Sequence, residues 1–223
     1  MFRIPTNKVR ESAIQSIRTK IKVSQCEAAV IASVVPSAGN YLRTQIQKQL
    51  GIRTFLIGKD MQAPVRNLYK NPKQVGMDRL MNAVAVHQAY KRNTIVIDFG
   101  TAITFDAVSA KGEYLGGVIA PGIEISLNAL YERTALLPKI KLAHPKAVIG
   151  RDTIESIRSG CSYGMGGLCD RIVLELRKKL GRNALVIATG GYAYFMSQYC
   201  TSIRQIDPDL VLRGIFLTYQ KNS

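Results

Sequence analysis

The chain has 223 residues, of which 47% are hydrophobic and 21% charged, a composition typical of a globular protein and not of a disordered one. No apolar run approaches the roughly 18 residues of a membrane-spanning helix, and the N-terminal stretch lacks the apolar core of a secretory signal peptide. The net charge of +16 would suit a polyanionic partner, but the basic residues are scattered along the chain, which favours a solvated basic surface over a dedicated nucleic-acid site.

The first ninety residues alternate apolar runs with helical patterns. Strands are expected at 28–35 and 53–57, and helices at 40–50 and from about 78 to 90. The first of these helices stops at Gly51, because glycine readily adopts the left-handed conformation of a helix cap. The stretch 63–76 holds two prolines and several polar residues and predicts a long loop. Long loops in compact domains often carry function.

The remainder of the chain predicts a small sheet flanked by helices. Strands are expected at 94–98, 103–109, 114–120 and 184–188, and helices from Pro121 to about Leu136, at 153–180 and from about 209 to 220. A glycine-rich break is expected at 164–167, and Gly181 should end that helix. No internal repeat is visible. We expect two domains, 1–91 and 92–223, with a boundary near Arg92.

The stretch TIVIDFGTAITFDAV, residues 94–108, predicts a hairpin with an acidic residue at its tip. A strand–loop–helix turn would suggest a P-loop or dinucleotide site, but here a second strand follows directly. Gly100 and Thr101 leave backbone N–H groups open to an anion, and Thr104 adds a hydroxyl. Asp98 can hold a metal ion or water against the same phosphates. The alternative is a simple β-meander whose aspartate caps a turn.

Three further stretches bear on the site. VIATGGYA, residues 186–193, predicts a strand that runs into a Gly-Gly turn, which suits a nucleotide but also an ordinary strand–helix turn. NPKQVGMDRL places Asp78 at a helix start, where the helix dipole stabilises an anion. Aspartate is common at such positions for structural reasons alone. In IGRDTIESIRSG, Asp152 or Thr153 starts a helix, and capping is the favoured role of Asp152.

Cysteine and histidine chemistry is not expected to be central. The four cysteines, Cys26, Cys161, Cys169 and Cys200, form no Cys-x-x-Cys pair, which predicts reduced thiols and a cytoplasmic location. The two histidines stand far apart in the sequence. This argues against a histidine metal site and against a Ser/His/Asp triad.

Taken in order, these motifs make the chain resemble the type III pantothenate kinases. The matching segments are SVVPS, YKNP, GMDR, DFGTAITFD, YLGGVIAPG, ALLP, IGRDTIESIRSG, ATGG and a terminal L-x-L-x-G-I, and they cover nearly the whole chain. Each segment is weak alone, but their joint order is specific. The resemblance implies an α/β fold of two actin-like ATPase or sugar-kinase (ribonuclease H-like) lobes, the first of them incomplete here.

The resemblance also implies roles for individual residues. Asp78 matches the catalytic base that faces the pantothenate hydroxyl. Residues matching the substrate pocket are Tyr69, Gly76, Met77, Arg79 and Thr153, the last reaching a pocket across a dimer interface. Residues matching the ATP site are Gly100, Thr101, Thr189, Gly190 and Gly191. Asp98 matches the ligand of a monovalent cation.

The implied reaction is ATP-dependent phosphorylation of pantothenate, the first step of coenzyme A biosynthesis. It would need magnesium with ATP and a potassium or ammonium ion, since positioning and cations supply most of phosphoryl-transfer catalysis. The resemblance further implies a cytoplasmic homodimer with no membrane or nucleic-acid partner.

The chain departs from the family pattern at its N-terminal end. Family members begin with a strand and a D-x-G-N-T turn, whereas FRIPTNK resembles the segment that follows that turn, and Ile103 stands where threonine is usual. We therefore expect either a start further upstream or a truncated chain with impaired activity. The alternative function is a catalytically inactive relative that acts as a regulatory or nucleic-acid-binding protein.

Overall fold

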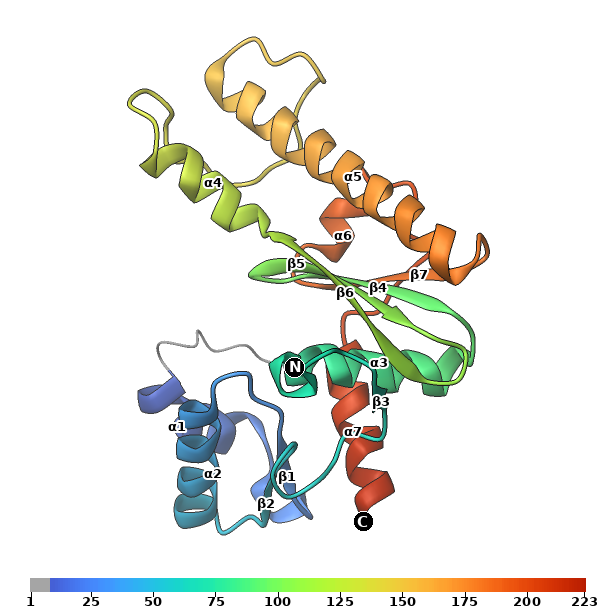
Figure 1. The fold of residues 1–223 in the computed structure, drawn as a ribbon. Coiled ribbons are helices and arrows are strands. Elements are labelled where there is room, and N and C mark those ends of the chain that lie inside the picture. Colours follow the sequence, from blue (N-terminus) through green and yellow to red (C-terminus); the bar gives the residue numbers. More distant parts are fainter. Residues whose placement is uncertain (1–8) are drawn as a thin grey trace. The chain divides into compact units, whose positions relative to one another are not determined.

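The structure is a computed structural model that describes residues 9–223, and the chain falls into two compact units (Figure 1). Unit 1 comprises Met1–Val65, Lys70–Ala85 and Val211–Ser223, and unit 2 comprises Arg66–Tyr69 and Val86–Leu210. This division differs from a single boundary at residue 92 in that it groups the last thirteen or so residues with the first part of the chain. The segment FRIPTNK lies outside the described residues.

Unit 1 contains a two-stranded parallel sheet with helices. Its elements are α1 (Val9–Lys20), a 3₁₀ helix (Val23–Gln25), β1 (Ala29–Ile31), α2 (Pro36–Leu50), β2 (Thr54–Leu56), a 3₁₀ helix (Pro72–Gln74), the first part of α3 (Met77–Tyr90) and most of α7 (Leu210–Asn222). The two strands pair from Ala29 opposite Thr54 onward. Ile31, Ile46, Ile52 and Leu56 form a buried cluster between this sheet and α2.

The first strand is shorter than the sequence predicts, and the helix after it is longer. β1 ends at Ile31, and α2 already begins at Pro36. Proline suits the first turn of a helix because its fixed φ is helical and its missing N–H is not needed there. The predicted cap at Gly51 is confirmed, since its φ is +67°.

Within unit 1, α7 packs closely on the first half of α3. A side chain at Gly214 would place its Cβ 2.0 Å from the carbonyl oxygen of Met81, so only glycine allows this approach. The hydroxyl of Thr218 donates to the sulfur of Met81 at 3.4 Å. The C-terminal helix therefore supports the helix that begins with the GMDR motif.

Unit 2 contains a six-stranded mixed sheet. Its strands are β3 (Arg66–Asn67), β4 (Thr94–Phe99), β5 (Ala102–Val108), β6 (Glu113–Pro121), β7 (Leu185–Gly190) and β8 (Gln205–Ile206), in the order β3-β6-β5-β4-β7-β8. The pairs β4–β5 and β5–β6 are antiparallel, and the other pairs are parallel. The predicted strands are confirmed with small shifts at their ends, whereas the two-residue strands β3 and β8 carry no clear sequence signal.

Helices cover one face of this sheet. The helices α4 (Ile123–Glu132), α5 (Thr153–Leu180) and α6 (Ala193–Met196) lie on the same side, as Figure 1 shows. The side chains of β4 and β5 that pack under them are Ile95, Ile97, Phe99, Ile103, Phe105 and Ala107. Because side chains alternate along a strand, the residues between these point to the opposite face.

The long helix α5 is continuous, so the predicted break at 164–167 is wrong. A side chain at Gly164 or Gly167 would meet no neighbour, whereas at Gly166 it would lie 2.1 Å from the carbonyl oxygen of Tyr199. Each helical glycine costs about 1 kcal/mol relative to alanine. Burial of Cys169 and Val173 against the sheet offsets that cost. None of the helices in residues 9–223 is both long and apolar enough to cross a membrane.

Asn93 ties three chain segments together where β4 and β7 begin. Its side chain donates to the carbonyl of Leu180 at 2.6 Å and accepts from the backbone N–H of Ala110 at 2.8 Å. Its own carbonyl accepts from the N–H of Leu185 at 2.9 Å. Asn93 thereby holds together, at one end of the sheet, the end of α5, the β5–β6 turn and the start of β7.

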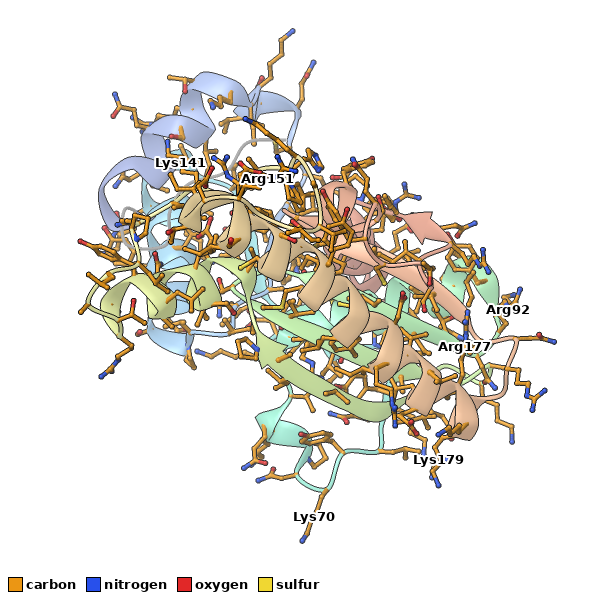
Figure 2. The ribbon with its side chains drawn as sticks, turned by 90° about the horizontal axis from the view of Figure 1, so that it is seen from above. Lys70, Arg92, Lys141, Arg151, Arg177 and Lys179 are labelled. Atoms are coloured by element: carbon orange, nitrogen blue, oxygen red, sulfur yellow. The ribbon has the colours of Figure 1, made fainter. Side chains whose placement is uncertain are left out.

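Basic residues that are scattered in the sequence gather near this end of the sheet. Figure 2 shows Arg92, Arg177 and Lys179 close to the C-terminal end of α5. Arg92 donates to the carbonyl of Asn183 at 2.5 Å, and Arg177 donates to that of Ala184 at 3.2 Å. Both guanidinium groups thus also hold the α5–β7 turn in place through hydrogen bonds. Such roles fit the expected solvated basic surface.

Candidate functional site

Asp98 lies near the end of β4, on the sheet face that α4 and α5 do not cover. In the register of the sheet it stands opposite Thr104 of β5 and beside Thr189 of β7. Asp98 is partly exposed. The two motifs that the sequence analysis linked to ATP, the hairpin and the ATGG turn, are therefore carried by adjacent strands.

The hairpin tip between β4 and β5 packs against the start of α4. Gly100 and Thr101 are exposed, as phosphate-binding groups must be. A side chain at Gly122, which precedes α4, would place its Cβ 1.9 Å from the carbonyl oxygen of Thr101. Glycine at 122 therefore lets the tip and the N-terminus of α4 meet, with the helix dipole directed toward the tip.

Gly190 brings the ATGG turn into contact with the hairpin. Its φ is +91°, a conformation that residues with a side chain rarely adopt. A Cβ there would lie 2.5 Å from Oδ1 of Asp98 and 2.6 Å from the carbonyl carbon and oxygen of Phe99. The turn continues along the hairpin, because the N–H of Tyr192 donates to the carbonyl of Phe99 at 3.4 Å.

Tyr192 links the same turn to α4. Its hydroxyl donates to the carboxylate of Glu124 in the first turn of that helix. Burial first, and then the hydrogen bond to Glu124, raise the pKa of the Tyr192 hydroxyl to about 12. The phenol therefore stays protonated at neutral pH and holds the ATGG turn against α4. No sequence motif predicts this pair.

Tyr69, the predicted aromatic residue of the substrate pocket, lies at the β3 edge of the sheet. Its ring is 6.3 Å from that of Tyr114, centroid to centroid, with an interplanar angle of 48°. Gly116 has a φ of +123°, and a Cβ there would be 3.7 Å from the Tyr69 ring. The N–H of Tyr69 donates to the side chain of Asn67 at 3.0 Å, which fixes the backbone that carries the ring.

A buried carboxylate, Asp106, lies beside this aromatic pair. It is fully buried. It accepts from the Tyr114 hydroxyl at 2.9 Å and from the Thr104 hydroxyl at 3.3 Å. The residue belongs to the DFGTAITFD segment, but the sequence pattern alone predicts no role for it. The available signal was an acid inside an otherwise apolar strand, two positions from a threonine on the same face.

The GMDR motif lies in unit 1, at the start of α3. Asp78 is in the first turn, and its Oδ1 accepts from the N–H of Arg79 at 2.9 Å. A Cβ at Gly76 would lie 2.4 Å from that same oxygen, so glycine is required for the carboxylate to hold this position. A Cβ at Gly58 would lie 2.9 Å from the terminal methyl of Met77. Arg79 is buried.

Thr153 is the first residue of α5 and is exposed. Asp152 caps the helix by accepting from the N–H of Glu155 at 2.8 Å, which confirms the predicted capping role. The neighbouring Glu155 accepts from the N–H of Lys146 and from Arg158, and these bonds lower the pKa of its carboxyl. Thr153 lines an open depression together with Leu136, Pro138, Asp152, Ile154, Glu155 and Arg158.

The described residues contain no group of three or more His, Cys, Asp or Glu side chains placed to hold a metal ion. A site at Asp98 would instead combine one carboxylate with backbone carbonyl and ligand oxygens, the donors that hard cations prefer. The Asp98 carboxylate packs closely against both neighbouring glycines: a Cβ at Gly190 would lie 2.5 Å from its Oδ1, and one at Gly100 would lie 3.5 Å from it.

The structure thus divides the predicted site residues into three groups. Unit 2 brings together Asp98 with the ATP-site residues Gly100, Thr101, Thr189, Gly190 and Gly191, and carries Tyr69 on the same sheet. Unit 1 carries Gly76, Met77, Asp78 and Arg79 as one motif. Thr153 stands apart from the other unit 2 residues of the site, at the start of a helix on the other face of the unit 2 sheet.

Residues 2–175 match the family described as type III pantothenate kinase. A type III pantothenate kinase from Syntrophus aciditrophicus is 43% identical over 218 residues, which cover 98% of this chain and 81% of that protein. One from Moorella thermoacetica is 40% identical over 203 residues, or 91% of this chain and 80% of that protein.

Solved structures share the fold at lower identity. A putative Baf family transcriptional activator from Campylobacter jejuni has a TM-score of 0.55 and 20% identity, covering 90% of this chain and 86% of that one. The ethanolamine utilization protein EutJ from Carboxydothermus hydrogenoformans has a TM-score of 0.50 and 16% identity, covering 96% and 73%. These likenesses support the fold only, which is the α/β fold of actin-like ATPases and sugar kinases.

Proposed function

Because the chain belongs to the type III pantothenate kinase family, we propose that it transfers the γ-phosphate of ATP to the primary hydroxyl of pantothenate. The product is 4'-phosphopantothenate, and the reaction is the first step of coenzyme A biosynthesis. The proposal's main structural support is the contact between Gly190 and Asp98, which joins the hairpin and the ATGG turn.

Asp78 is the proposed catalytic base. An alcohol attacks phosphorus more readily when a carboxylate within hydrogen-bond reach accepts its proton. The O–H bond breaks as the new P–O bond forms, the proton passes to Asp78, and ADP leaves with the electrons of the broken P–O bond. The requirement for glycine at 76 supports a fixed position of the Asp78 carboxylate, because any side chain there would displace its Oδ1. Tyr69, Gly76, Met77 and Arg79 are the proposed pantothenate-binding residues.

Nucleotide binding is assigned to the hairpin tip and the ATGG turn. Gly100 and Thr101 supply N–H and hydroxyl donors for phosphate oxygens, and Thr189, Gly190 and Gly191 form the surface for the nucleoside. Magnesium bound with ATP would supply charge neutralisation on the phosphates. Asp98 is the proposed ligand of a potassium or ammonium ion, because its carboxylate is partly exposed near the end of β4, next to the hairpin tip.

A homodimer is proposed on the strength of exposed apolar residues around the start of α5. Leu136 is 91% exposed, Ile149 81% and Val148 62%. The segment carrying the latter two is fixed on α5, since Ser159 donates to the carbonyl of Val148 at 2.5 Å. Fixed, exposed apolar side chains mark interaction surfaces. Thr153 lines an open depression together with Leu136 and is proposed to reach the partner's pantothenate pocket. A cytoplasmic location is proposed from the ATP requirement and from the buried, free Cys161, Cys169 and Cys200.

The direct test is a coupled assay that measures ADP formation from ATP and pantothenate. Pantothenate-dependent turnover, stimulated by potassium or ammonium over sodium, is the expected result. Omission of pantothenate controls for ATP hydrolysis, and mass spectrometry identifies the phosphorylated product. ADP formation that does not depend on pantothenate, or phosphorylation of a sugar alcohol in its place, would contradict the proposal.

A further inference from the structure

The buried carboxylate of Asp106 is not explained by the roles assigned so far. An ionised group is costly to bury unless hydrogen bonds stabilise it. Here two hydroxyls donate to it, one from Tyr114 and one from Thr104. Each of these donors lies next to a residue of the proposed site: Tyr114 packs on Tyr69, and Thr104 stands opposite Asp98.

The position of Asp106 on the sheet is what allows it to bind both donors. Along β5 its side chain points to the same face as that of Thr104, two residues earlier, because side chains alternate. Tyr114 approaches from β6, where it pairs with Val108, two residues after Asp106 on the same face. Asp106 therefore lies at the middle of a row that begins beside Asp98 and ends at Tyr69.

The Tyr69 ring depends on its neighbour for support. A Cβ at Gly116 would lie at ordinary contact distance from the Tyr69 ring. Gly116, which has no side chain, therefore does not hold the ring in place. The ring of Tyr69 packs on the ring of Tyr114, and Tyr114 itself is fully buried. A hydroxyl anchored at 2.9 Å on a carboxylate gives Tyr114 one orientation, and hence gives Tyr69 a fixed surface to pack on.

We propose that Asp106 is a positioning residue: through the hydroxyl of Tyr114 it fixes the ring of Tyr69 in the wall of the pantothenate pocket. The proposal rests on the proposed function for the identity of the ligand. It assigns Asp106 no contact with substrate and no proton transfer. Its effect is on how well the pocket is formed before pantothenate arrives, which should change the affinity for pantothenate more than turnover.

The first test is a double-mutant cycle. Tyr114→Phe keeps the ring and removes the anchored hydroxyl, and we expect it to raise the KM for pantothenate about tenfold, or ~1.4 kcal/mol, with kcat changed less than about twofold. In a Tyr69→Ala background the same change should have almost no further effect, because coupled residues are not additive. Tyr219→Phe is the matched control, since it also removes a tyrosine–carboxylate hydrogen bond, 2.8 Å long, to Glu27. An unchanged KM, or equal effects in both backgrounds, would overturn the proposal.

The second test does not depend on catalysis. The chain contains no tryptophan, so Tyr69→Trp creates a single indole reporter at the pocket wall. Asp106→Asn or Tyr114→Phe, each added to this reporter, should roughly double the rate constant for acrylamide quenching as the ring loosens, and Tyr219→Phe should leave it unchanged. Thermal unfolding of each variant establishes that it is folded. Unaltered quenching in both folded variants would refute the positioning role, whereas an inactive parent chain with the expected quenching would refute only the proposed function.

Discussion

A side chain at Gly190 would collide with Asp98, because the Cβ position of the first lies 2.5 Å from Oδ1 of the second. Gly190 of β7 pairs with Phe99 of β4, the residue after Asp98, so neither backbone can retreat without disturbing the register of the sheet. The Asp98 carboxylate can therefore hold its position only because residue 190 has no side chain.

Gly190→Ala should therefore abolish most activity by displacing Asp98 and the ATGG turn. We expect kcat/KM for ATP to fall at least about 100-fold, or ~2.7 kcal/mol, as measured in the coupled assay. Gly181→Ala is the matched control: Gly181 also has a positive φ, +100°, but a Cβ there meets nothing. It should cost stability through strain of about 1–3 kcal/mol and leave activity intact. Equal losses of activity in both variants would show that strain alone is responsible.

Asp78→Asn should remove the proposed base while keeping its shape. The expected result is a fall in kcat of ~10²–10⁴, the usual contribution of a positioned base, with the KM for ATP little changed. Asp60→Asn is the control, because it neutralises another carboxylate of unit 1, one that pairs with Arg43 at 3.0 Å. Near-normal turnover in the Asp78→Asn enzyme would disprove the assignment.

Assembly can be tested at the exposed apolar residues near the start of α5. Ile149→Asp places a charge on a side chain that is 81% exposed, so it should leave the fold intact but weaken self-association. Sedimentation should show a dimer for the parent chain and a shift toward monomer for the variant, with a higher KM for pantothenate. Leu174→Asp, at a 54% exposed position near the other end of α5, should remain dimeric. A fully active monomeric parent would contradict both the dimer and the role of Thr153.

Asp170 should contribute stability that depends on pH. Burial opposes its charge, but hydrogen bonds from Ser202, Cys200 and Thr201 prevail and lower the pKa of its carboxyl from 3.8 to about 2. A group whose folded pKa is depressed contributes its full stability above the unfolded pKa and loses it as pH falls through the folded value.

The stability difference between the parent chain and Asp170→Asn should accordingly be constant from neutral pH to about 5 and shrink between 3.8 and about 2. Urea unfolding at several pH values measures it. A difference that does not vary with pH would mean that the asparagine variant loses packing and not a stabilised charge.

Polyanion binding tests the alternative function of a nucleic-acid-binding protein. The basic residues near the end of α5, including Arg92, Arg177 and Lys179, should give only weak association with duplex DNA. Such binding falls steeply between about 50 and 200 mM salt, because it depends on counterion release. Fluorescence anisotropy at two salt concentrations is sufficient. Tight, sequence-dependent binding at about 150 mM salt would favour the alternative.

The fold of unit 2 was accessible from the sequence because its strands are long, apolar and separated by glycine-rich turns. The three strands around Asp98 and the strand before the ATGG turn are all present with ends shifted by one or two residues. The break expected in α5 is absent. The prediction failed because the sequence does not reveal that Gly166 is packed on Tyr199. The two-residue strands β3 and β8 are defined by their partners and not by their own residues.

The candidate site was predictable in part. Motifs with glycine and aspartate at fixed spacing indicated Asp98 and Gly190, and the structure brings these two together. Asp106 and Tyr114 were not predictable, because their importance arises from a hydrogen bond between different strands. The tie between Tyr192 and Glu124 spans 68 positions in the chain and likewise leaves no local signal.

Asn93 has a consequence for how unit 2 can respond to ligands. It fastens the end of the sheet where β4 and β7 begin, whereas Asp98 and Gly190 lie where these strands end. Ligand-induced changes in amide hydrogen exchange should therefore be graded along β4, with Thr94 and Ile95 equally protected in the free and bound states. We expect the turns that follow Asp98 and Thr189 to adjust when the proposed nucleotide binds, while the end of the sheet that Asn93 holds keeps its strand register unchanged.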